Sequence, residues 1–239
     1  MLFLRELART IIDLVYPHFC VICQTGLEED WLCENCQATT QRIQPPFCQT
    51  CSRPFSGAIP APFRCPHCED NVFAFDCAVS PYLARGAVRE LIHRLKYNGQ
   101  FHLRNTIADW LWVAFSDPRI SEEPFDAIVP VPLHPVRQRE RGYDQVSALA
   151  EIVARRAEKP LLKCLRRHRY TQTQTVLDRD DRVRNLHDAF ELRKSTAVLG
   201  KRILLLDDVL TTGTTLHECA KVLLSGGAIS IRAVTVARG

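Results

Sequence analysis

Residues 203–215 read Ile203-Leu204-Leu205-Leu206-Asp207-Asp208-Val209-Leu210-Thr211-Thr212-Gly213-Thr214-Thr215. The run of aliphatic residues at its start predicts a fully buried strand, of the kind found inside a parallel sheet. Asp207 and Asp208 follow, and we expect both at the carboxyl end of that strand. A loop of Thr and Gly comes next, and the apolar spacing from Leu216 to Leu224 is that of a helix. The stretch therefore predicts a strand, an acidic turn, a loop and a helix N-terminus.

This order of elements is typical of a ligand site in an open α/β sheet, where ligands bind beyond the carboxyl ends of the strands. The loop N–H groups, the threonine hydroxyls and the positive end of the helix dipole favour a phosphate group. The paired carboxylates suit hydroxyl groups instead, or a magnesium ion held through water. The alternative is an ordinary strand–turn–helix unit with carboxylates on its surface.

The chain of 239 residues is long enough for one sizeable domain and a smaller unit. No apolar run is long enough to span a bilayer, so we expect no transmembrane segment. Residues 1–15 are largely apolar, but charged residues interrupt them too often for a signal peptide. We expect residues 1–16 to form an amphipathic helix whose apolar face docks on the rest of the protein, with peripheral membrane binding as the alternative. We expect the protein to be cytoplasmic.

Charge is unevenly distributed along the chain. The formal net charge is +4, from 31 Lys and Arg against 27 Asp and Glu. Residues 1–76 hold five Arg and nine acidic residues, whereas residues 133–184 hold thirteen basic and seven acidic residues. The sequence therefore predicts a basic patch in its second part.

Eight of the eleven cysteines form four Cys-x2-Cys pairs: Cys20/Cys23, Cys33/Cys36, Cys48/Cys51 and Cys65/Cys68. Each pair supplies half of a tetrahedral zinc site, so four pairs predict two sites in a double zinc ribbon. A redox role is the alternative for any single pair, but four pairs in one short segment argue against it. Residues 17–76 hold too few aliphatic side chains for a core of their own, and metal binding takes its place.

We assign the first four of these cysteines to one structural zinc ion and the last four to a second one. Spacing alone leaves an interleaved arrangement open. His67 lies inside the last pair and ranks below the cysteines as a ligand. Cys77, Cys164 and Cys219 have apolar neighbours and are expected in the core.

From Cys77 onward strands and helices alternate, which predicts an α/β domain over residues 77–239. We expect strands at residues 78–83, 126–130, 161–165, 189–192 and 228–237, and helices at residues 87–97, 102–115, 142–156 and 178–186.

Two basic segments lie between these elements. A proline-containing turn at residues 131–135 precedes Arg137, Arg139 and Arg141, which we expect in a loop where their guanidinium groups hold phosphate or pyrophosphate oxygens. A solvated basic loop is the alternative. Residues 166–174 are polar, basic and without periodicity, and they predict a second loop.

Residues 203–215 resemble the 5-phosphoribosyl-1-pyrophosphate (PRPP) motif of type I phosphoribosyltransferases. Further segments resemble the competence-associated ComF family in its form with an N-terminal double zinc ribbon: Leu91-Ile92, Leu95-Lys96-Tyr97, residues 129–145, Gln174, Arg184-Asn185 and Ala189-Phe190. The resemblance covers nearly the whole chain from Val15 onward.

The resemblance implies the type I phosphoribosyltransferase fold, a Rossmann-like and mostly parallel sheet with flanking helices, preceded by the zinc ribbons. Asp207 and Asp208 would hold the ribose hydroxyls, and residues 211–215 (Thr211, Thr212, Gly213, Thr214 and Thr215) would hold the 5′-phosphate. Magnesium would bind with PRPP, and the arginines of residues 137–141 would neutralise the departing pyrophosphate. Purine-salvage members place an Asp at the position of Thr211, so the residue that acts on the base in those enzymes is missing here.

The resemblance also implies a bacterial protein that handles single-stranded DNA during natural transformation. The candidate nucleic-acid residues are basic, with one aromatic side chain for stacking on a base: Arg166, Arg167, Arg169, Arg179, Arg182 and Tyr170. One alternative is an active phosphoribosyltransferase of nucleotide metabolism with an unknown acceptor. Another is an adaptor whose zinc ribbons bind a DNA helicase or recombination protein.

Overall fold

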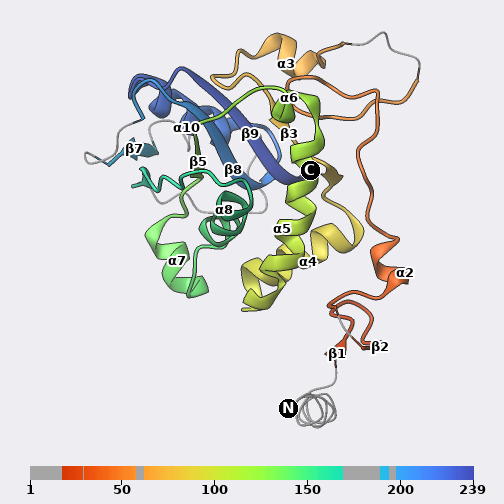
Figure 1. Ribbon diagram of the computed structural model, residues 1–239. Coiled ribbons are helices and arrows are strands. Elements are labelled where there is room, and N and C mark those ends of the chain that lie inside the picture. Colours follow the sequence, from red (N-terminus) through yellow and green to blue (C-terminus); the bar gives the residue numbers. More distant parts are fainter. Residues whose placement is uncertain (1–17, 29, 58–61, 169–188, 194–197) are drawn as a thin grey trace.

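The computed structural model describes residues 18–28, 30–57, 62–168, 189–193 and 198–239 (Figure 1). The helices expected at residues 1–16 and 178–186 lie outside these ranges. Within the ranges, no helix has both the length and the apolar character needed to cross a membrane.

The core of the fold is a parallel sheet with the strand order β3-β9-β8-β5. Its long central strands are β8 (Arg202–Leu210) and β9 (Ser230–Arg238), flanked by β5 (Ala127–Pro130) and β3 (Ala78–Val79), while β4 (Tyr82–Leu83) also pairs with β9. All of these pairings are parallel. Because both faces of a parallel sheet are covered, the first half of β8 is a run of aliphatic residues, and Ile203 to Leu206 are at most 1% exposed. The expected mostly parallel α/β fold is confirmed.

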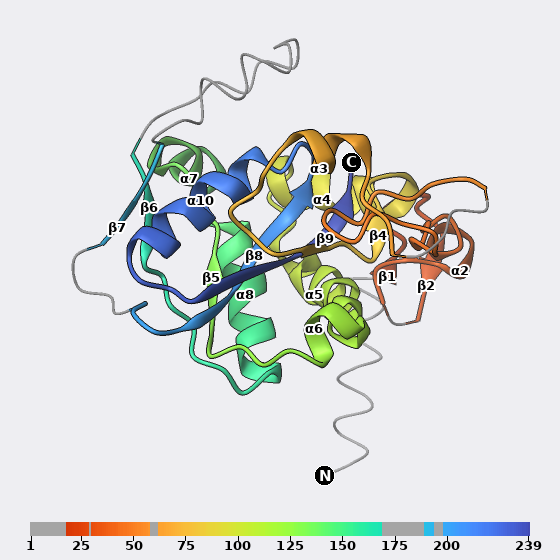
Figure 2. The same ribbon diagram turned by 90° about the horizontal axis from the view of Figure 1, so that it is seen from above.

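Helices cover both faces of the sheet (Figure 2). The helices α5 (Arg104–Trp112) and α8 (Gln145–Arg156) pack against each other and against the sheet, and α4 (Gly86–Tyr97) packs on α5. On the other face α10 (Thr214–Ser225) contacts β8 and β9. The short turn η1 (Phe101–Leu103) joins α4 to α5, and η2 (Val113–Ser116) and α6 (Pro118–Ser121) lead from α5 to β5.

A separate antiparallel pair joins β6 (Leu165–Arg167) to β7 (Phe190–Leu192), and β7 packs against α10. The strand expected at residues 161–165 is shifted along the chain, because β6 begins at Leu165. Leu161 forms an isolated bridge to Ile128. Arg166 and Arg167, expected in a loop, belong to β6 because each pairs with a residue of β7.

The described N-terminal segment consists of short elements joined by irregular stretches (Figure 1). These are β1 (His18–Phe19), β2 (Gly26–Leu27), α2 (Glu34–Gln37) and α3 (Pro66–Asp70). Hydrogen bonds join the segment to the larger sheet: the Ala78 N–H donates to the Thr50 carbonyl over 2.8 Å, and the Ala87 N–H donates to Thr39 Oγ1 over 3.0 Å.

Three expected boundaries are wrong for identifiable reasons. The strand β8 does not end before Asp207, because its pairing with β9 continues to Leu210. The strand expected at residues 78–83 is split into β3 and β4. The three arginines lie in a helix, α7 (Pro135–Arg141), because Pro135 occupies the first helical position and His134 Nδ1 accepts from the Val136 N–H.

Candidate functional site

The candidate phosphate loop, residues 211–215, connects the end of β8 to the first turn of α10. Gly213 caps the helix with a φ of 87°, a left-handed conformation that side chains other than glycine rarely adopt. A Cβ at this position would lie 3.0 Å from the Phe73 ring, so a side chain here would also crowd that ring. The Thr212 and Thr214 hydroxyls are 2.9 Å apart at the start of α10. A helix of this length offers its first N–H groups to an anion at this end.

Asp208 is buried and held from two helices. Lys96 Nζ, at the end of α4, lies 2.7 Å from its Oδ1 atom, and Gln145 Nε2, at the start of α8, donates to Oδ2 over 3.2 Å. Asp208 is 5% exposed, so this carboxylate is stabilised by its two partners rather than by water. Sequence reasoning missed both partners, although Lys96 belongs to one of the segments that carry the family resemblance.

Asp207 is only partly buried and faces the other side of the sheet. Neighbouring residues of a strand point to opposite faces, and Asp207 lies close enough to Arg167 of β6 and Cys219 of α10 to affect their pKa values. Loss of hydration, and then the charge of Asp208, raises the pKa of Asp207 to about 7. The two carboxylates therefore do not form one matched pair. Asp207 is the more exposed of the two, and its Oδ1 atom accepts from the Asp208 backbone N–H over 2.8 Å.

The three predicted pyrophosphate arginines do not share one face of α7. Residues four apart lie on the same side of a helix and residues two apart do not, so Arg139 is separated from Arg137 and Arg141. Arg137 is 2.8 Å from Glu140, and the Arg141 guanidinium lies 4.9 Å from the centre of the Tyr97 ring.

A cavity of about 370 Å³ opens between the loop after β5, the start of α8 and strand β6. Its lining combines basic, acidic, aromatic and proline residues: Lys163, Arg166, Arg167, Arg193, Asp144, Glu151, Phe101, Tyr143, Pro130, Pro132 and Pro135. The Phe101 and Tyr143 rings are 4.8 Å apart. Arg167 lines this cavity and also lies close to Asp207.

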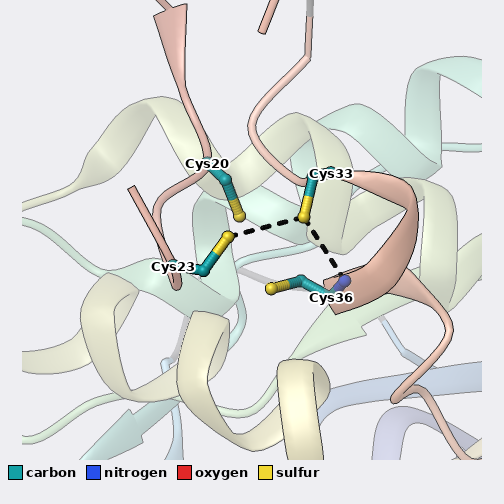
Figure 3. Close-up of side chains that lie close together, drawn as sticks. All are labelled: Cys20, Cys23, Cys33 and Cys36. Atoms are coloured by element: carbon teal, nitrogen blue, oxygen red, sulfur yellow. Dashed lines mark hydrogen bonds between the residues drawn. The ribbon is translucent and has the colours of Figure 1, made fainter. Parts of the chain in front are cut away.

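The eight paired cysteines gather in the two predicted sets, Cys20, Cys23, Cys33, Cys36 and Cys48, Cys51, Cys65, Cys68. Within each set the four sulfur atoms lie within 4.8 Å of one another (Figure 3 shows the first). Cys23 Sγ is 3.5 Å from Cys33 Sγ, and Cys51 Sγ is 3.7 Å from Cys65 Sγ. Tetrahedral zinc with Zn–S bonds of about 2.3 Å separates its sulfur ligands by roughly 3.8 Å. Both donor sets therefore fit structural zinc.

The other cysteines and His67 are placed differently. Cys77, Cys164 and Cys219 are buried in the hydrophobic core, as expected. His67 is not in either sulfur cluster; its Nε2 atom lies 3.0 Å from the Thr212 carbonyl oxygen in the phosphate loop. No sequence pattern pointed to this contact, which joins residues far apart in the chain.

The predicted nucleic-acid residues are described only in part. Arg166 has a side chain that is 57% exposed and lies 3.5 Å from Glu191. Arg167 is half-buried, with its guanidinium 5.5 Å from the centre of the Phe190 ring. The remaining candidates lie outside the described residues: Arg169, Tyr170, Arg179 and Arg182.

Comparison with known proteins gives matches to both parts of the chain. A double zinc ribbon domain matches residues 11–70 and a phosphoribosyl transferase domain matches residues 147–239. Competence protein F of Haemophilus influenzae is 32% identical over 228 residues, which cover 92% of this chain and 96% of that protein. Competence protein ComFC of Bacillus subtilis is 26% identical, covering 94% and 96%, and DNA utilization protein YhgH of Escherichia coli is 29% identical, covering 92% and 96%.

Proposed function

Because the chain belongs to the ComF family of competence proteins, we propose that it binds PRPP with magnesium and handles single-stranded DNA during natural transformation. In this proposal residues 17–76 are a zinc-binding module and residues 77–239 a phosphoribosyltransferase-like domain. The observation that carries the proposal is the position of Asp207, a partly exposed carboxylate on the strand that leads into the phosphate loop.

The two halves of the site suit the two halves of a phosphoribosyl ligand. The N–H groups at the start of α10 favour the 5′-phosphate, and the ionised Asp207 carboxylate accepts a hydrogen bond from a ribose hydroxyl. Asp208 binds Lys96 and Gln145 on the face of β8 opposite Asp207. Magnesium, when bound with PRPP, would neutralise the pyrophosphate charge.

Isothermal titration calorimetry tests this site. The parent protein should bind PRPP only when magnesium is present, and Asp207→Ala should weaken binding at least tenfold, because it removes the hydroxyl acceptor. A variant that binds as the parent does would move the ribose site elsewhere. Asp126→Ala is a matched control, since Asp126 pairs with Arg202 at the opposite end of β8.

Single-stranded DNA is the proposed macromolecular partner because of Arg166, Lys163 and Arg193, which line the cavity beside the ligand site. Their charges attract the phosphate backbone, and the exposed position of Arg166 keeps it accessible. The relatives are named as competence and DNA utilization proteins, which supports this partner.

Phosphoribosyl transfer is a second candidate function, favoured by the cavity, whose volume suits a small acceptor. Transfer would break the bond between ribose C1 and the pyrophosphate oxygen and form a bond from C1 to the acceptor, releasing magnesium pyrophosphate. A screen of nucleobases for pyrophosphate release tests it: release with one base supports transfer, and release with none leaves a binding protein.

A further inference from the structure

One helix connects the second cysteine site to the phosphate loop. Cys65 caps α3 and Cys68 lies within it, with His67 between them. His67 Nε2 is 3.0 Å from the Thr212 carbonyl oxygen, and Asn71 Nδ2 is 3.2 Å from His67 Nδ1. Asn71 Nδ2 can only donate, so His67 Nδ1 accepts and carries no proton. The Thr212 carbonyl can only accept, so His67 Nε2 carries the proton of the ring. His67 therefore donates to Thr212.

The segment after α3 makes two more contacts with the same region. The Phe73 ring lies against Gly213 so closely that an added Cβ would be 3.0 Å from it. The Ala74 N–H donates to the ring nitrogen His217 Nδ1 over 3.0 Å. The backbone N–H of His217 donates to the Gly213 carbonyl over 2.8 Å, within the first turn of α10. Residues 67–74 thus hold the phosphate loop and the first turn of α10 together.

The hydrogen bond from His67 also orients a donor of the loop. The Thr212 carbonyl and the Gly213 N–H belong to one planar peptide unit and point in opposite directions. When His67 holds the carbonyl on the side of α3, the Gly213 N–H is turned away from α3. The direction of this N–H is what matters for an anion at the helix N-terminus.

The position of His67 depends in turn on the second cysteine site. A helix of five residues is unstable alone, and α3 is fixed where Cys65 and Cys68 join the sulfur cluster with Cys48 and Cys51. Zinc at this site would hold α3 in the conformation that reaches Thr212. The first site packs elsewhere: its Trp31 lies 4.1 Å from the His102 ring, in η1.

We propose that His67 is a positioning residue of the PRPP site, and that zinc at the second cysteine site orders the phosphate loop through it. The inference rests on the proposed PRPP function for its ligand, but the ordering of the loop does not need a ligand to be present.

Hydrogen exchange of the full-length protein without ligand is the first test. His67→Ala should increase amide exchange in residues 211–217, while His67→Gln, which keeps a side-chain N–H donor, should restore much of the protection. Elemental analysis should still find two zinc ions in both variants, because His67 is not a ligand. Unchanged exchange in His67→Ala, or a loss of zinc from it, would overturn the positioning role.

Affinity for magnesium PRPP is the second test. His67→Ala should weaken binding about five- to tenfold, the effect of losing one oriented hydrogen bond, with partial rescue in His67→Gln. Cys51→Ser and Cys33→Ser should each lose one zinc ion, and only Cys51→Ser should weaken binding and speed exchange in the loop. Equal effects of the two cysteine variants on PRPP affinity and loop exchange would contradict the proposal that the second zinc site orders the phosphate loop. If the parent does not bind PRPP but the exchange results hold, the proposed ligand is wrong and the ordering role stands.

Discussion

Lys96 Nζ lies 2.7 Å from Asp208 Oδ1 and joins the last turn of α4 to the central strand β8. The side chains are 20% and 7% exposed, so both charges are largely removed from water. Removing one partner of such a pair leaves the other charge buried without compensation. The pair therefore joins α4 to β8 inside the protein, and a single substitution in it should have a large effect on stability.

Lys96→Met should lower the free energy of unfolding by about 2–4 kcal/mol in urea denaturation, because among the described residues Asp208 then keeps Gln145 as its one side-chain donor. Lys163→Met is the matched control. Lys163 is also 2.7 Å from its carboxylate, Glu151, but both side chains are 51% exposed, and the loss should be below about 1 kcal/mol. Similar losses in the two variants would contradict this role of burial.

PRPP affinity should increase from pH 6 to pH 8. Asp207 accepts a ribose hydroxyl only when it is ionised, and its pKa is raised to about 7 by loss of hydration and by Asp208. At pH 6 only about a tenth of the protein is in the ionised form, so calorimetry should show affinity about five- to tenfold weaker than at pH 8.

The control for this pH dependence is Asp207→Asn, which should bind weakly and lose the part of the pH dependence that belongs to Asp207. The same variant tests the sign of the pKa shift through stability. A carboxyl whose pKa is raised on folding is harder to ionise in the native state than in the unfolded state, so its ionisation lowers the free energy of unfolding. The loss is complete above pH 7 and absent below about pH 4. Asp207→Asn should therefore be more stable than the parent at pH 8, by at most about 4 kcal/mol, and should lose this advantage at pH 4.

A chelator should remove zinc in two steps. Cys23 is exposed and Cys33 is partly exposed in the first site, whereas all four cysteines of the second site are buried. Full-length protein should contain two zinc ions by elemental analysis, and release followed with a colorimetric dye should be fast for one and slow for the other. Cys33→Ser should remove the fast step alone. Release in a single step, or a zinc content near one, would contradict the two-site assignment.

Much of this fold could be predicted from local sequence, because four aliphatic residues before the acids and helical spacing after them are local signals. The end of β8 could not, since the residues Asp207 to Leu210 are held in the strand by β9. The helix α7 was missed because prolines around His134 favour a loop by themselves, although Pro135 suits a first helical turn. Contacts of Lys96 with Asp208 and of His67 with Thr212 join residues more than a hundred positions apart, so no spacing rule shows them.

Arg166→Ala should weaken binding of a single-stranded oligonucleotide and lower the salt dependence of log K by about 0.7 for one lost phosphate contact. Its side chain is 57% exposed beside the basic cavity. Arg155→Ala, at an exposed position of α8 that does not line this cavity, is the control and should change neither quantity. A titration in which both variants keep parental affinity and slope would remove this arginine from the DNA site.

Arg167→Ala should act differently from its neighbour, because this half-buried guanidinium packs on Phe190 and is close to Asp207. Its positive charge favours the ionised form of Asp207. Without it, the pH at which PRPP affinity reaches half its maximum should move upward, and the salt dependence of DNA binding should change little. A downward shift would contradict the proximity of the two charges.

The central claim is that residues 207–215 hold a phosphoribosyl ligand, and a crystal structure of the parent protein with magnesium and PRPP tests it most directly. The account predicts the 5′-phosphate within hydrogen-bond distance of backbone N–H groups in residues 212–215, with Asp207 accepting from a ribose hydroxyl and Asp208 still bound by Lys96. A PRPP molecule bound with its 5′-phosphate away from this loop, or a loop that stays without ligand at saturating PRPP, would contradict it.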